Sequence, residues 1–167
     1  MRSAVSGRLG IILTVVALAV GSLVLFCQSE DTQVAYPEGY RDWTHVKSMV
    51  LQPGHQLYEA FGGIHHVYAN DKALQALKSG GAFPDGAVLV FDLLEALEQD
   101  NAIVEGPRKV VGVMEKNSAR FAATGGWGFE GFKGDTRERV VTDPNGQCYA
   151  CHASQKEKDF VFSSYRP

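Results

Sequence analysis

The chain has 167 residues, of which 45% are hydrophobic, and this length allows one domain with a substantial core. Acidic and basic residues are interspersed at a net charge of −3. Because neither a basic stripe nor a phosphate-binding glycine motif is present, the composition argues against a nucleic-acid partner.

The N-terminal segment predicts a membrane anchor. Residues 9–26 are uncharged, follow Arg2 and Arg8, and at about 1.5 Å per helical residue span roughly 27 Å, just enough to cross a bilayer core. Positive charge before the run predicts that the remainder of the chain is exported. Small residues at 17–19 keep a cleaved signal peptide open as the alternative. We expect a domain on the periplasmic face of a bacterial inner membrane, or free in the periplasm after cleavage.

These features divide the chain into three parts. Residues 1–27 are assigned to the signal anchor or signal peptide, and the polar residues 28–35 to a linker. Residues 36–167 form one domain, without internal repeats or low-complexity tracts.

Within this domain the hydrophobic pattern is mostly that of strands. Runs bounded by Gly, Pro, Asn or Asp predict strands at 46–51, 64–69, 87–93, 109–114 and 127–132. Short helices are predicted at 71–79 and 117–123. The expected fold class is α+β, mainly β: an antiparallel sheet of about five strands with short helices, followed by a C-terminal helix that carries a cysteine motif.

That motif lies in "NGQCYACHAS", residues 145–154, where Cys148, Cys151 and His152 share five positions. Two cysteines separated by two residues and followed by histidine are the pattern that attaches haem c, through two thioether bonds and an axial iron ligand. We therefore expect one covalently bound haem c and a C-terminal haem-attachment helix, with His152 as the axial ligand.

Two other uses of the motif remain open. A structural zinc site needs four ligands, but the other histidines lie far upstream and the only other cysteine is Cys27. A thioredoxin-like redox pair belongs after an early strand at a helix start, whereas this pair lies near the C-terminus.

Seven motifs in order carry a resemblance to a known family: "WTHV", "GGIHHVYAN", "FPDGAVLV", "VMEKNSARF", "TGGWGF", "CYACH" and "DFVFSSYRP". From about Tyr36 to Tyr165 the chain resembles the cytochrome P-460 family of β-sheet c-type haem proteins. In its hydroxylamine-oxidising branch, a lysine bonds covalently to the macrocycle, and the register of "DGAVLVFDL" places Phe91 at that position. Lys72 and Lys78 do not match it.

In this respect the chain is similar to the cytochrome c′-beta branch, which lacks the cross-link. That resemblance implies a dimeric protein with a five-coordinate iron that binds small gases, chiefly nitric oxide and also carbon monoxide. It also implies that Phe61 is a second phenylalanine of the distal pocket.

The residues themselves support an apolar distal side. Phe91 shares a strand face with Ala87 and Leu89, so it offers apolar surface and no hydrogen-bond donor to a haem on that face. The alternative is that Phe61 and Phe91 belong to an ordinary core. His65 could reach the same pocket or be a surface or hydrogen-bonded histidine.

Several other residues were weighed. Met114 could be a sixth iron ligand, although its strand position favours the core. His66 points away from His65 and is a weaker candidate for the pocket. Lys116 and Arg120 could pair with haem propionates, but solvated charges are the simpler interpretation.

Trp127 and Phe129 pack either on the macrocycle or in the core, and the sequence does not choose between the two. Three functions remain: binding of nitric oxide, which we favour; oxidation of hydroxylamine or nitric oxide; and electron transfer.

Overall fold

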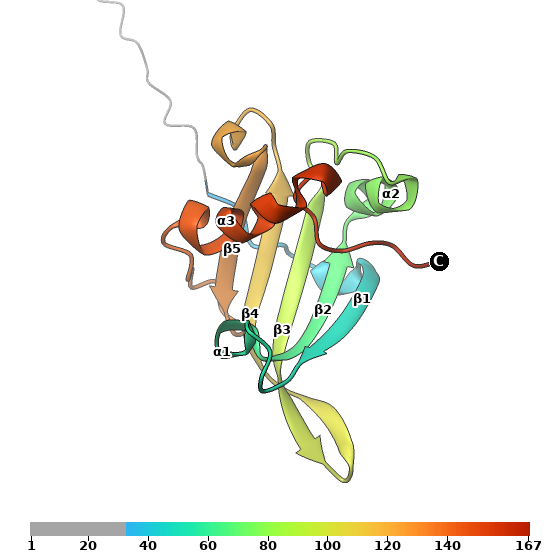
Figure 1. The fold of residues 1–167 in the computed structure, drawn as a ribbon, viewed down its shortest axis with the longest axis vertical. Coiled ribbons are helices and arrows are strands. Elements are labelled where there is room, and N and C mark those ends of the chain that lie inside the picture. The colour runs from blue at the N-terminus through green and yellow to red at the C-terminus, as the bar shows by residue number, and fades with distance from the viewer. Residues whose placement is uncertain (1–32) are drawn as a thin grey trace, which may run out of the picture.

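The computed structural model describes residues 33–167 and shows one five-stranded antiparallel sheet in the order β1-β2-β3-β4-β5 (Figure 1). The strands are β1 (Thr44–Leu51), β2 (Gly63–Ala69), β3 (Val88–Gln99), β4 (Ala102–Lys116) and β5 (Trp127–Lys133). The predicted mainly β class is confirmed. The predicted anchor at 1–27 lies outside the described residues, and among residues 33–167 no helix has the length and apolar character that a membrane crossing requires.

The helices are short, as predicted, and α2 (Asp71–Ser79) has the predicted bounds. The side chain of Asn70 accepts a hydrogen bond from the Ala73 backbone at 3.0 Å, which caps the first turn. Gly80 ends the helix in the left-handed conformation. Two further helices are α1 (Tyr58–Phe61) and α3 (Ala150–His152).

The helix predicted at 117–123 is wrong, because this segment forms a turn and only the 3-10 helix Ala122–Thr124. The Asn117 side chain accepts a hydrogen bond from the Arg120 backbone at 3.1 Å and starts a single turn. Gly125 and Gly126 follow with positive φ and return the chain to β5, so the helix has no room to extend.

Strands β3 and β4 extend well beyond the predicted 87–93 and 109–114. Their outer halves form a hairpin arm that projects from the sheet (Figure 1). Asp100 and Asn101 close the arm with φ values of 52° and 63°, the left-handed pair that a tight two-residue hairpin turn requires.

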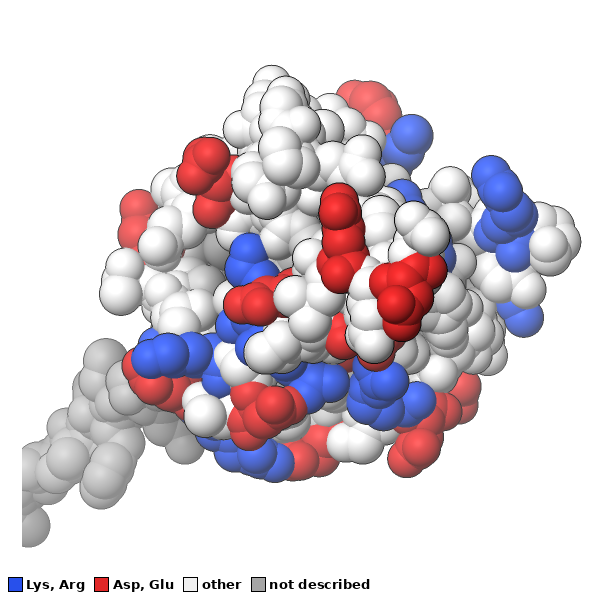
Figure 2. All heavy atoms as spheres, turned by 90° about the horizontal axis from the view of Figure 1, so that it is seen from below, with Lys and Arg blue, Asp and Glu red and all other residues white. Residues whose placement is uncertain are grey.

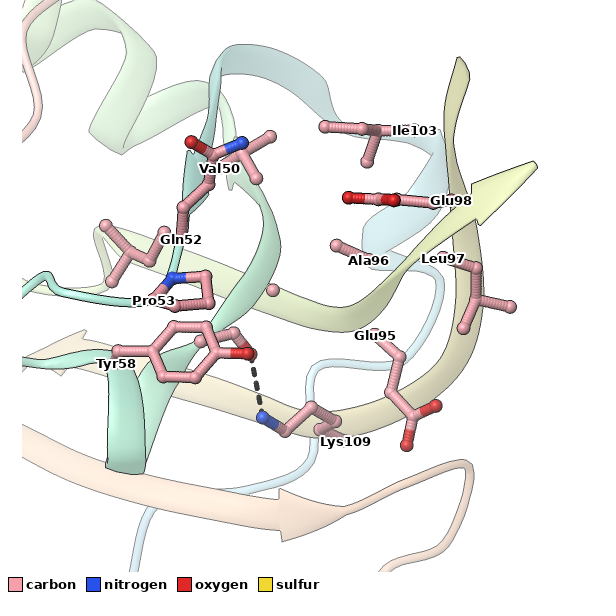
Figure 3. Close-up of a pocket in the computed structure, with 13 residues that line it drawn as sticks. Val50, Gln52, Pro53, Tyr58, Glu95, Ala96, Leu97, Glu98, Ile103 and Lys109 are labelled. Carbon is pink, nitrogen blue, oxygen red and sulfur yellow. Dashed lines mark hydrogen bonds between the residues drawn. The ribbon is translucent and has the colours of Figure 1, made fainter. Parts of the chain in front are cut away.

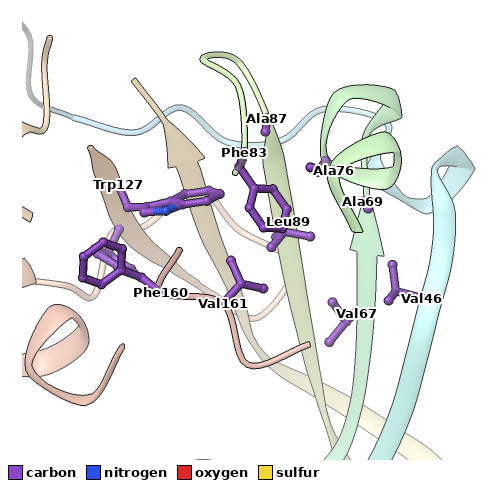
Figure 4. Close-up of a cluster of buried hydrophobic side chains, with 12 residues drawn as sticks. Val46, Val67, Ala69, Ala76, Phe83, Ala87, Leu89, Trp127, Phe160 and Val161 are labelled. Carbon is purple, nitrogen blue, oxygen red and sulfur yellow. The ribbon is translucent and has the colours of Figure 1, made fainter. Parts of the chain in front are cut away.

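The sheet carries a hydrophobic cluster on each face. The first, which we call the front cluster, lies under the C-terminal segment and is drawn in Figure 4. Its fully or nearly buried members are Val46, Val67, Ala69, Ala73, Ala76, Phe83, Ala87, Leu89, Trp127, Phe129, Phe160 and Val161. Since Phe160 and Val161 belong to it, the chain that follows the cysteine motif is packed onto the front face of the sheet.

The opposite face is covered by the chain before β1. Val34 is 2% exposed and Tyr40 is 3% exposed, and both pack there with Val111 and Phe132. Packing on this face thus includes Val34, within the stretch assigned to a linker. Asp92 is fully buried nearby and accepts hydrogen bonds from Tyr40, Arg41 and Arg108, so its charge is paired. The sheet thus has buried packing on both faces, and its front face carries the C-terminal segment.

The surface matches the mixed charge pattern of the sequence. Figure 2 shows acidic and basic side chains intermingled over the face seen from below, without a continuous area of one sign. This face offers no extended basic surface for a nucleic-acid backbone.

Candidate functional site

The cysteine motif lies in a helical segment on the front face of the sheet. A π-helical turn, Asn145–Tyr149, leads into α3. Cys148 and Cys151 are three residues apart on this helical segment, so their side chains leave it on the same side. Both thiols are free; Cys148 is half-buried against the front cluster, whereas Cys151 is exposed.

The environment of Cys148 keeps its thiol protonated. Burial raises the pKa of Cys148 to about 11, with smaller contributions from the carboxylates of Glu130 and Asp143. In the chain without a cofactor, Cys148 is therefore a packed thiol and a poor nucleophile at neutral pH.

The ring of His152 is oriented by a backbone carbonyl. Its Nδ1 lies 2.8 Å from the Phe160 carbonyl oxygen, which can only accept a hydrogen bond, so Nδ1 carries the proton and Nε2 keeps a free lone pair. Phe129 and Phe162 flank the ring at centroid distances of 5.0 and 5.1 Å. Burial lowers the pKa of His152 and keeps the ring neutral, the state in which histidine binds a metal.

The carbonyl that orients His152 is itself held in place. Asp159 and Phe160 are consecutive non-glycine residues with φ of 49° and 64°, a conformation that surrounding contacts must enforce. The Asp159 carboxylate accepts hydrogen bonds from Lys116 Nζ at 2.7 Å and from the Phe83 backbone at 2.8 Å. Trp127 Nε1 donates to the Asp159 carbonyl at 2.9 Å. These contacts fix the turn that aims the Phe160 carbonyl at His152.

Three of the predicted pocket residues lie together on the same face of the sheet. The rings of Phe61 and Phe91 are 6.0 Å apart between centroids, and His65 lies 4.6 Å from Phe91. Phe61 is 38% exposed and Phe91 is half-buried. Neither ring is fully enclosed, which favours the pocket interpretation over that of an ordinary core.

Phe91 packs directly over the backbone of β4. A Cβ added to Gly112 would come within 2.9 Å of the Phe91 ring. Gly112 pairs with Gly131 of β5, so the strands beside Phe91 present bare backbone there. Neither position is open surface, because the Phe91 ring lies over Gly112 and the Val140 side chain lies close to Gly131.

Several residues that the sequence offered as haem contacts have other roles. Lys116 is 8% exposed and paired with Asp159, so its interpretation as a solvated charge is wrong. Arg120 forms an ion pair with Glu115 at 3.1 Å. Met114 is a partly buried member of the front cluster, as its strand position predicted.

The two neighbouring histidines have opposite surroundings. His66 faces away from the pocket and contacts Ser48 and Glu105, at 2.6 Å in each case. His65 is 2% exposed and packs on the pocket side. Of the two, only His65 can take part in the site.

A separate cavity of about 420 Å³ lies at the far end of the sheet (Figure 3). It lies between α1, the end of β1 and the hairpin arm, and its lining residues include Tyr58, Glu95 and Lys109. Lys109 Nζ donates to the Gly62 carbonyl at 2.7 Å and thereby ties β4 to the end of α1. The cavity includes none of the motif residues, so we place the functional site at the cysteine motif instead.

The donor set at the motif fits a haem. Two free thiols and a histidine with Nε2 available are the donors that haem c binding requires. For comparison, no three His, Cys, Asp or Glu side chains within 33–167 are grouped as metal ligands, which disfavours a zinc site in that part of the chain.

Comparison with known families supports the same assignment. The family model described as Cytochrome P460 matches residues 37–163, which is more than half of the chain. The chain belongs to the cytochrome P460 family. A search of curated proteins found no match.

Membership of the cytochrome P460 family implies a haem cofactor. Within this cytochrome P460 chain, the sequence predicted the motif and the neighbouring rings of Phe61 and Phe91, but it did not indicate Asp159 and Phe160. The sequence marks these two residues only by their position directly before Val161 and Phe162. Their role depends on contacts with β4 and β5.

Proposed function

We propose that this cytochrome P460 protein binds one haem c covalently through Cys148 and Cys151, and that it captures nitric oxide on the iron face opposite His152. The observation that carries the proposal is the pairing of Phe61 and Phe91, two partly exposed rings in contact on the face of the sheet that His152 also faces. When bound, the haem supplies an iron with one axial position open to small ligands.

The proximal side of the site is prepared for one firm axial bond. His152 presents the lone pair of Nε2 because Nδ1 is engaged by the Phe160 carbonyl. A histidine whose second nitrogen is fixed in this way keeps its ring orientation and is a better ligand. When haem is bound, His152 would therefore hold it through Nε2.

The distal side is apolar and offers no hydrogen-bond donor that would activate a ligand. Phe61 and Phe91 provide apolar rings, which cannot donate hydrogen bonds to a bound ligand. Phe91 also occupies the position where the hydroxylamine-oxidising branch carries its cross-linking lysine. Both features favour the binding of a neutral diatomic gas over oxidation of a substrate, which is the alternative function.

Electron transfer is less compatible with the site. It needs a stable sixth ligand, and the packing of Met114 within the front cluster favours a structural role for this thioether. His65 engages its Nε2 with the Phe61 carbonyl and is therefore not free to ligate through that atom.

The proposal includes a location and an assembly. Covalent attachment of haem c takes place outside the cytoplasm, and the apolar run at 9–26 would hold the domain at the periplasmic face of the membrane. The resemblance to the cytochrome c′-beta branch supports a homodimer.

Two measurements on the full chain, expressed with the haem-attachment machinery, test the proposal. Acid-acetone should leave the haem on the protein, because thioether bonds survive unfolding, and Cys148→Ala with Cys151→Ala should release it. The reduced protein should then be high-spin and should bind nitric oxide tightly. Loss of haem from the unaltered chain would refute covalent attachment, and a low-spin reduced spectrum would indicate electron transfer.

A further inference from the structure

His65 is the most buried polar side chain of the pocket, and its two nitrogens differ. It is 2% exposed, and its Nε2 lies 2.5 Å from the Phe61 carbonyl oxygen. Because a carbonyl only accepts hydrogen bonds, Nε2 must carry the proton. Nδ1 therefore holds a lone pair, and it is the buried side-chain nitrogen or oxygen for which residues 33–167 provide no partner.

The position of this lone pair relates it to the pocket. The His65 ring packs 4.6 Å from Phe91, which in turn contacts Phe61. His65, Val67 and Phe91 all point to the front face, since strand side chains alternate and Val67 pairs with Phe91. A ligand that took the place of the Phe91 ring would therefore lie beside the His65 ring.

The surroundings keep His65 neutral. Burial is the main cause of its lowered pKa, and the nearby Lys109 ammonium lowers the pKa further. The Phe61 hydrogen bond acts in the opposite direction but fixes the proton on Nε2. The ring therefore remains an acceptor at Nδ1 near neutral pH.

A purely structural role explains this arrangement poorly. A buried acceptor without a partner destabilises the fold, and an apolar side chain of similar size would fill the same space without that cost. The Phe61 hydrogen bond accounts for Nε2 but leaves Nδ1 unexplained.

We propose that His65 Nδ1 is the hydrogen-bond acceptor of the distal pocket, and that it selects iron ligands bearing N–H or O–H bonds over ligands that can only accept. This inference rests on the proposed haem site. Bound dioxygen and small anions are stabilised by a hydrogen-bond donor, but His65 Nδ1 offers them only a lone pair. An amine ligand can donate a hydrogen bond to that lone pair. Nitric oxide gains no hydrogen bond from His65 and depends on its strong bond to iron.

The test compares two probe ligands on the ferric holoprotein, methylamine as a donor and fluoride as an acceptor. In His65→Leu, methylamine affinity should fall roughly 2- to 13-fold, the range of one neutral hydrogen bond, while fluoride affinity should not fall. His65→Gln should restore methylamine binding, because its amide can donate to the Phe61 carbonyl and accept through its oxygen. His66→Leu, on the opposite face, is the matched control and should bind both ligands as the unaltered protein does.

Equal changes for both ligands in His65→Leu, or a selective loss of fluoride binding, would overturn the proposal. A variant-free measurement covers the case in which His65→Leu does not fold. Nitrogen-15 NMR of the carbon monoxide complex, labelled at histidine, should show Nε2 protonated and Nδ1 bare, and a proton on Nδ1 would refute the inference. Loss of haem in acid-acetone would instead contradict the proposed function, so the two failures are distinguishable.

Discussion

His152 Nδ1 donates a hydrogen bond of 2.8 Å to the carbonyl of Phe160, eight residues later in the chain. This contact joins the cysteine motif to a turn that β4 and β5 hold through Lys116 and Trp127. The orientation of the His152 ring thus depends on the sheet and not only on its own helix.

The first prediction concerns Asp159. Asp159→Ala leaves the Lys116 ammonium largely buried without its partner, at 10% side-chain exposure, and should lower the free energy of unfolding by about 3 kcal/mol. Urea denaturation measures this loss. Glu138→Ala removes an exposed ion pair with Lys133 and should cost less than about 1 kcal/mol. Similar losses in the two variants would show that the Lys116 pair has no structural role.

The second prediction concerns Phe91. If every ligand must displace this ring, Phe91→Ala removes a steric cost of about 1–3 kcal/mol and should raise carbon monoxide affinity roughly 5- to 150-fold. Water entering the emptied pocket would reduce the gain. Carbon monoxide titration measures it, with Leu97→Ala on the exposed hairpin arm as the control. Equal affinities in Phe91→Ala and the unaltered protein would remove the ring from the ligand path.

The third prediction separates Met114 from the iron. Met114→Ala should leave the reduced spectrum high-spin and unchanged, because His152 is the single firm axial ligand proposed. Its cost should appear in stability instead, at about 2 kcal/mol, since the thioether is partly buried in the front cluster. A low-spin unaltered protein that becomes high-spin in this variant would assign Met114 to the iron.

The fourth prediction concerns the thiols of the chain produced without haem. Only the thiolate is nucleophilic, and burial raises the pKa of Cys148 to about 11. At pH 8, iodoacetamide should therefore modify the exposed Cys151 first, and the Cys148 rate should rise as the pH approaches 11. Mass spectrometry of time points measures both rates. In urea the two thiols should react alike, and equal rates in the folded chain would contradict the burial of Cys148.

Local patterns predicted most of the sheet. The alternation of side chains along β2 predicted that His65 and His66 lie on opposite faces of the sheet, and the structure places them so. The outer half of the β3–β4 hairpin was missed because both its faces are exposed, so burial imposes no alternation there. The length of a strand can be predicted from alternating apolar and polar residues only where one face of the strand is buried.

The remaining errors concern contacts made across long distances in the chain. Lys116 looked like a solvated charge because its partner, Asp159, lies 43 residues away. The left-handed pair at Asp159 and Phe160 has only a weak local signature, since aspartate tolerates this conformation but phenylalanine does not favour it. Tertiary contacts impose that turn, and no window of sequence around the motif contains them.

The close approach of Phe91 to Gly112 has a consequence for the history of the family. The glycine is needed because of a neighbouring ring, since its own φ lies outside the positive range and the nearest atom to an added Cβ is Phe91 Cδ1 at 2.9 Å. Relatives that replace the phenylalanine with a side chain directed away from β4 are free to acquire a larger residue at the glycine position. The positions of Phe91 and Gly112 should therefore co-vary among relatives. A glycine at the second position would indicate a relative that keeps an aromatic ring at the first.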